Sequence, residues 1–160
     1  MKWRGWRGWF VALLMVCAPV PLAIAQSNLD AATTNEQYVP RLGDIMNAIQ
    51  TRDMKLWFAG KALNWELAAY ELRQLKAGLL EAAVLYEGIP VTNVTTMTAP
   101  VQSIADAIEA KDSRRFAKAT GKLTAGCNAC HRSIGRGFIV IQTPTVSPFS
   151  NQLFAPQRKQ

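Results

Sequence analysis

The chain has 160 residues, an apolar content of 49% and a formal net charge of +7. The length suits one domain with a single hydrophobic core. Beyond the first ten residues no run of Lys and Arg exceeds two, so the sequence argues against nucleic-acid binding. The remaining cationic excess would favour an acidic protein partner through weak steering.

The first 25 residues have the three parts of a secretory signal peptide. The segment MKWRGWRGWF carries three cations and no acid, an apolar run follows, and small residues stand at Ala23 and Ala25. The apolar run is broken by prolines and is too short to span a bilayer comfortably, which leaves a retained interfacial anchor as the alternative. Cleavage after Ala25 would leave 135 of the 160 residues and lower the charge from +7 to +4. We therefore expect residues 1–25 to be a signal peptide and the mature protein to be periplasmic, without stable membrane insertion.

Residues 26–37 are polar and small, and we expect them to form a flexible lead-in. A helical pattern starts after Pro40, because apolar residues recur there at spacings of three and four or their sums. Gly60 is expected to end or bend this first helix. Its apolar positions are Leu42, Ile45, Met46, Ile49, Leu56 and Trp57.

A second helix is expected after Asn64, whose side chain can cap it, with Glu66 favourable in its first turn. Its apolar stripe advances in steps of four and three, as in a helix packed nearly parallel to its neighbours. Residues 87–90 are expected to end the helix, and the segment PVTNVTTMTA, residues 90–99, is expected to form a loop. The stripe consists of Ala68, Leu72, Leu75, Leu79, Ala82 and Tyr86.

The third helix is expected to begin at Thr98, with Pro100 in its first turn. A fourth helix is expected to be capped by Asp112 or Ser113, and a kink is expected near Gly121. The third helix has an apolar face of Val101, Ile104, Ala105 and Ile108. The stripe of the fourth runs through Phe116, Thr120, Leu123, Cys127, Cys130 and Ile134, so both cysteines continue its inward face.

The character of the chain changes after Gly135, because three prolines exclude a continuous helix. Residues 137–160 are expected to form an extended C-terminal tail, in which 138–141 are either a short strand or an arm laid over an apolar surface. No internal repeat and no second domain is visible. The sequence therefore predicts an all-α fold, a four-helix bundle over residues 38–136.

The segment CNACH, residues 127–131, contains the single histidine of the chain and two of its three cysteines. C-x-x-C-H is the pattern of covalent haem c attachment. Two cysteines one turn apart on a helix can each form a thioether with one haem vinyl group. The imidazole of His131, on the same side of the porphyrin edge, can then reach the iron. The sequence therefore predicts one covalent haem c, held by Cys127 and Cys130 with His131 as an iron ligand.

Three other readings of the segment are open. A structural zinc site wants four ligands, and the mature chain offers two Cys and one His. A redox dithiol wants a strand-to-helix setting, whereas this segment lies late in an expected helix. A local disulfide beside an incidental histidine is the third reading. The predicted export favours haem, because haem c is assembled outside the cytoplasm.

With its C-x-x-C-H motif on the last helix, the chain resembles the class II c-type cytochromes, the cytochrome c′ family, over about residues 38–136. The resemblance implies a haem between the helices, bound by Cys127 and Cys130, with His131 as the proximal ligand. It also implies, by family analogy alone, a homodimer. The chain departs from the family in continuing for 29 residues after His131 and in having Gly135 where a basic residue is frequent. Arg136 is the candidate to replace that residue as a contact of a haem propionate, and a solvated charge is the alternative.

The sixth iron ligand decides between two chemistries. With one histidine in the chain, bis-histidine ligation by one chain is excluded. A Met/His pair suits electron transfer because it raises the reduction potential, and low-spin members of the resembled family take this methionine from the first helix. Met46, on the inward stripe, is the candidate, with Met54 and Met97 as alternatives. The alternative role of Met46 is packing in the core. The sixth coordination position of the iron would then be vacant or filled by a ligand other than methionine.

The sequence thus predicts a periplasmic cytochrome that carries single electrons between redox protein partners, and not an enzyme. A peroxidase would want a distal acid–base group, and no second histidine is present. The alternatives are a five-coordinate protein that binds NO or CO and a haem subunit of a redox enzyme complex. The tail is apolar enough to dock on a partner or on the bundle itself.

Overall fold

The computed structural model describes residues 38–89 and 91–157. The expected signal peptide (1–25) and lead-in (26–37) lie outside the described residues. Contacts divide the chain into Met1–Tyr38 and Val39–Gln160, and the description that follows concerns the second unit. None of the described helices is both long and apolar enough to cross a membrane.

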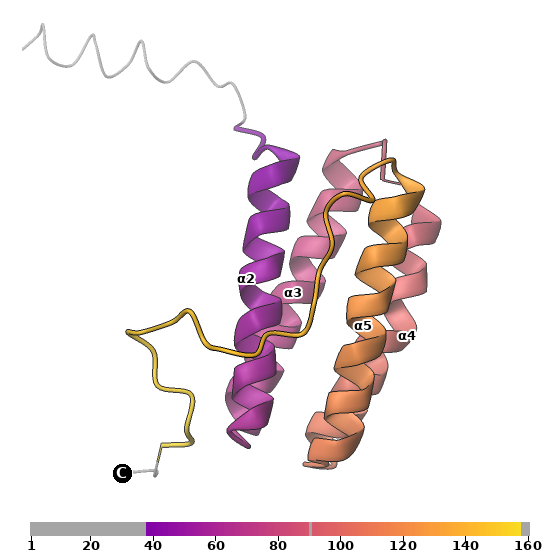
Figure 1. Ribbon diagram of the computed structural model, residues 1–160. Helices are drawn as coiled ribbons and strands as arrows, with labels where there is room; N and C mark the ends of the chain where they lie inside the picture. The colour runs from indigo at the N-terminus through magenta and orange to yellow at the C-terminus, as the bar shows by residue number, and fades with distance from the viewer. Residues whose placement is uncertain (1–37, 90, 158–160) are drawn as a thin grey trace, which may run out of the picture. The chain divides into compact units, whose positions relative to one another are not determined.

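Four helices lie side by side in this unit, and its described residues contain no strand (Figure 1). They are α2 (Leu42–Lys61), α3 (Trp65–Leu85), α4 (Val91–Glu109) and α5 (Ser113–Ser133). The short connections make α2–α3 and α4–α5 antiparallel pairs, and these two pairs have the most extensive contacts. Helices α2 and α5 contact each other much less. The expectation of an all-α fold with four helices is confirmed.

Helices α3 and α5 begin where the sequence places a capping side chain. The Asn64 carboxamide oxygen accepts from Leu67 N at 3.2 Å. The Asp112 carboxylate accepts from Arg114 N at 3.0 Å and from Arg115 N at 2.9 Å. Each bond satisfies an amide that the helix itself leaves unpaired, so both predicted helix starts are confirmed.

Helix α4 differs from the expectation, because it begins at Val91 and includes Pro100 in its interior. The segment expected to be a loop is therefore its first two turns. Val94 and Met97 lie on the same face as Val101 and pack against the core. Burial of this continued stripe outweighs the backbone hydrogen bond that Pro100 cannot donate.

A group of three aromatic side chains, Trp57, Trp65 and Phe116, lies at the end of the bundle where α2 ends and α5 begins. The Phe116 ring, 1% exposed, stacks on Trp57 at 6.3 Å between centroids and meets the edge of Trp65 at 5.9 Å. A Cβ at Gly60 would collide with the Phe116 ring, so this glycine allows the ring to approach the α2 backbone. Helix α2 ends at Lys61, one residue after Gly60, so the expected end of the helix at this glycine is confirmed to within one residue.

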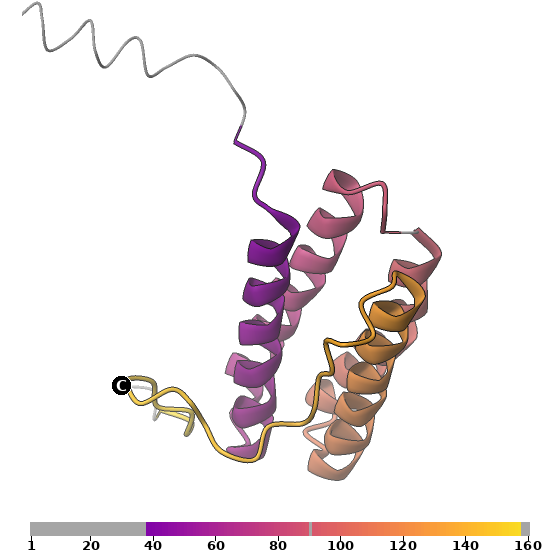
Figure 2. The same cartoon turned by 45° about the horizontal axis from the view of Figure 1, so that its top comes forward.

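The tail reverses direction at the end of α5. Gly135 has φ +72°, Gly135 N donates to Arg132 O at 3.2 Å, and Arg136 N donates to His131 O at 2.7 Å. These two bonds and the left-handed glycine form a Schellman motif. The chain then runs back along α5 and crosses to α2 (Figures 1 and 2). Residues 138–141 are thus an extended arm, and the strand alternative is wrong.

Candidate functional site

A cavity of about 330 Å³ lies between the helices, toward the ends of α3 and α5 and the beginnings of α2 and α4. Its volume is within the range of small-molecule sites. The tail also contributes to its wall, through Ile139 and Ile141. The apolar lining from the helices includes Leu42, Ile49, Leu75, Leu79, Ala82 and Val94, and Ile89 and Ile134 contribute from the turns that follow α3 and α5.

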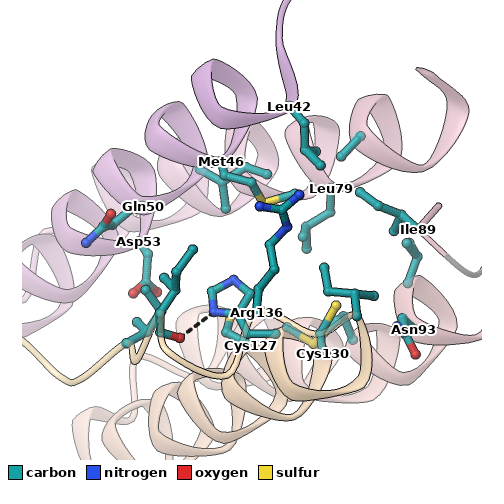
Figure 3. Close-up of a pocket in the computed structure, with 18 of the residues that line it drawn as sticks. Leu42, Met46, Gln50, Asp53, Leu79, Ile89, Asn93, Cys127, Cys130 and Arg136 are labelled. Carbon is teal, nitrogen blue, oxygen red and sulfur yellow. Dashed lines mark hydrogen bonds between the residues drawn. The ribbon is translucent and has the colours of Figure 1, made fainter. Parts of the chain in front are cut away.

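The three haem-motif residues all line this cavity from α5 (Figure 3). Cys127 and Cys130 are free thiols of intermediate exposure, so the local disulfide reading does not describe this structure. His131 is one residue further on the same helix. Because the predicted stripe of α5 carries the motif to the inner face, one wall of the cavity presents two thiols and an imidazole.

The His131 ring has one nitrogen paired and one available. Its Nδ1 lies 2.9 Å from the backbone oxygen of Ile139, and this hydrogen bond is the dashed line in Figure 3. A carbonyl oxygen can only accept, so Nδ1 carries a proton, and in the neutral imidazole Nε2 then keeps its lone pair. A histidine that donates one N–H to a backbone carbonyl is the usual arrangement of a metal-ligating imidazole.

The two thiols are held in their neutral form. Burial, with smaller contributions from the charges of Asp53 and Cys130, raises the pKa of Cys127 to about 12. Burial also raises the pKa of Cys130, partly offset by a hydrogen bond from Asn93. Thiolate is the nucleophile in disulfide exchange. Neutral thiols in apolar surroundings therefore do not resemble a poised redox dithiol.

Of the methionines considered as the sixth ligand, Met46 and Met97 line the cavity and Met54 does not. Met46 is part-buried on α2, and its side chain extends toward the cavity in Figure 3. Met97, 4% exposed, packs against the α5 backbone, where its Sδ would be 2.7 Å from a Cβ at Gly126. Helix α2 thus presents Met46 to the same cavity as His131.

Arg136 also lines the cavity, and its side chain extends toward Met46 (Figure 3). The residue itself is exposed and lies just after the Schellman turn. A guanidinium at this position is suited to a carboxylate ligand, because it can donate two parallel hydrogen bonds.

Asp53 is a cavity residue that the sequence analysis missed as a candidate (Figure 3). It is 8% exposed, and its Oδ1 has no hydrogen-bond partner. Burial raises its pKa from 3.8 to about 6. The signal was present, because Asp53 falls four residues after Ile49 and three before Leu56 on the buried stripe of α2.

Four aromatic residues that follow closely in the sequence, Trp57, Phe58, Trp65 and Tyr70, do not line the cavity. Trp57 and Trp65 pack around Phe116, and the Phe58 ring lies 5.8 Å from that of Phe154 in the tail. The Arg52 guanidinium lies over the Tyr70 ring at 5.9 Å. These four aromatic residues form helix and tail contacts, and the cavity lining contains none of them.

Within residues 38–89 and 91–157, no group of three or more His, Cys, Asp or Glu side chains is arranged to hold a metal ion. Comparisons with protein-family models, curated proteins and solved structures found no significant match to this chain. The arguments for function therefore come from the motif and from the geometry of the cavity.

Proposed function

We propose that the chain is an exported, divergent class II c-type cytochrome that carries one covalent haem c and transfers single electrons between redox protein partners. The single observation that carries the proposal is the state of His131. Its Nδ1 is hydrogen-bonded to Ile139 O at 2.9 Å, which leaves Nε2 available as a ligand. His131 lines the same cavity as the thiols of Cys127 and Cys130.

The residues present fit this group by their chemistry. Cys127 and Cys130 would hold it through thioethers, His131 would bind the iron on one side, and Arg136 would contact a propionate. The apolar lining would exclude water around it. When bound, haem supplies the Fe(III)/Fe(II) couple, and the chain's part is to hold it, orient the imidazole and set its surroundings.

Met46 is the proposed sixth ligand. It comes from α2 and lines the same cavity as His131, which comes from α5. A methionine ligand paired with a histidine ligand would raise the reduction potential, which suits an electron carrier.

The proposal is tested by mass spectrometry of the secreted protein, made in a host that attaches haem c. We expect a mature chain beginning at Gln26 whose mass is increased by one haem. Cys127→Ser together with Cys130→Ser should abolish the increase. A wild-type protein with the bare polypeptide mass and two thiols that can be alkylated would overturn the proposal.

The sixth ligand is tested by absorption spectra of the ferric and ferrous protein, with and without CO. We expect the ferric charge-transfer band of methionine–iron coordination in the wild type and its loss in Met46→Ala. Met54→Ala is the matched control, because it removes a methionine from the same helix outside the cavity lining. Rapid CO uptake by the reduced wild type would instead favour the gas-binding function.

A further inference from the structure

The tail is fastened to α5 by a pair of hydrogen bonds at Asn128. The Asn128 Nδ2 donates to Ile141 O at 2.8 Å, and its Oδ1 accepts from Ile141 N at 2.7 Å. One carboxamide therefore satisfies both backbone groups of one residue, as a neighbouring strand would. Asn128 is part-buried and lies between the two cysteines of the motif.

Two residues before this attachment, the same extended segment supplies the carbonyl that accepts from His131 Nδ1. The segment has two turn contacts upstream, Arg136 N to His131 O and Ile139 N to Arg136 O at 2.9 Å. The position of the Ile139 carbonyl is therefore held from both sides, by the turn and by the Asn128 pair.

We propose that Asn128 is a positioning residue for the iron ligand: its carboxamide fixes Ile141, which holds the Ile139 carbonyl on His131 Nδ1 and so orients the imidazole. This inference rests on the proposed haem function. It gives the segment after residue 135 a role in orienting the His131 imidazole, through the carbonyl of Ile139.

The physical consequence concerns the basicity of the ligand. A hydrogen bond from Nδ1 to a carbonyl raises the basicity of the metal-bound nitrogen and fixes the ring orientation. A more basic ligand stabilises Fe(III) relative to Fe(II), which lowers the midpoint potential. Loosening the Ile139 carbonyl should therefore raise that potential.

The test compares full-length wild-type protein with Asn128→Ala and Asn64→Ala. Asn64 is the matched control, because its Nδ2 donates to another carbonyl of the same tail, Phe154 O, at 3.1 Å. The measurements are the midpoint potential, and the deuterium exchange rate of the His131 Nδ1 proton followed by NMR. Asn128→Ala removes both hydrogen bonds to Ile141. We expect it to raise the potential and to speed exchange about fivefold, the effect of losing the one hydrogen bond from His131 Nδ1 to Ile139 O. Asn64→Ala should leave both unchanged.

Asn128→Asp is the second variant, and it serves if the alanine variant does not fold. Its carboxylate still accepts from Ile141 N but cannot donate to Ile141 O, so the exchange rate should lie between those of wild type and alanine. A haem-loaded Asn128 variant with wild-type potential and exchange rate would overturn this inference alone. Absence of haem from the wild type would instead overturn the proposed function.

Discussion

The two ends of this bundle are built on the same helices and are packed in opposite ways. At the end where α5 begins, Phe116 fills the space between the helix pairs and is 1% exposed. At the other end, the same face of α5 carries Cys127 and Cys130, and a cavity of about 330 Å³ lies in front of them.

The difference follows from the size of the side chains along one stripe. From Phe116 to Leu123 the stripe is fully buried, whereas the cysteines that continue it are of intermediate exposure. Gly60 admits the Phe116 ring to α2 at the packed end. We infer that the packed end holds the helices together while the other end leaves room for a ligand. This division of work can be tested by substitutions at each end.

Removal of the Phe116 ring should have the largest effect on stability. Phe116→Ala takes away the ring between Trp57 and Trp65, and the free energy of unfolding should fall by about 3–5 kcal/mol. Urea unfolding of the purified protein measures this change. A loss below about 1 kcal/mol would show that the packed end does not hold the bundle together.

The buried carboxyl of Asp53 should make stability depend on pH. Its pKa is raised from 3.8 to about 6 in the folded protein by burial, so ionisation favours the unfolded state. The penalty is absent below pH 3.8, grows as the pH rises and is complete above about pH 6. At neutral pH it amounts to about 3 kcal/mol. Asp53→Asn should remove this dependence, so the free energy of unfolding should change between pH 4 and pH 7 by less in the variant than in the wild type. The same change in both proteins would contradict the prediction.

A matched pair of glycine substitutions compares the two ends directly. In Gly60→Ala the new methyl group meets the Phe116 ring, which is enclosed by Trp57 and Trp65, and the loss should be about 1–3 kcal/mol. In Gly126→Ala it meets the flexible Met97 thioether beside the cavity. That change should be neutral or stabilising, by at most about 1 kcal/mol, because alanine favours helix. Thermal unfolding that ranks the two variants in the opposite order would contradict the comparison.

The smallest loss of stability is expected at the cap of α3. Asn64→Ala removes the bond from Leu67 N and the bond to the tail at Phe154 O. Loss of such a cap lowers stability by about 1 kcal/mol. Differential scanning calorimetry should show a small decrease in melting temperature, and no change would mean that water replaces both bonds.

Much of the fold could be read from the chain alone. The spacing of apolar residues predicted α2, α3 and α5, and the caps Asn64 and Asp112 marked two starts correctly. The start of α4 was misplaced because Pro100 is a strong local signal, whereas the burial of Met97 depends on a neighbouring helix. Local sequence rules therefore identified the helices, but they misplaced a helix start where tertiary packing keeps a proline inside the helix.

The candidate site was also only partly visible. The motif named Cys127, Cys130 and His131, and the stripe of α2 named Met46, all four of which line one cavity. The spacing of apolar residues could not show that Asp53 Oδ1 lacks a hydrogen-bond partner, since this depends on which groups from other helices lie near it.

By itself, the sequence determined the number of helices and the face of α5 that carries the motif, because both follow from the period of a helix. Only the tertiary structure decided that the tail returns along α5, that Ile139 O accepts from His131 Nδ1 and that Asn128 holds Ile141. These contacts join residues eight and thirteen positions apart across a chain reversal. Their partners are therefore selected by the path of the backbone after Gly135, which no local pattern encodes.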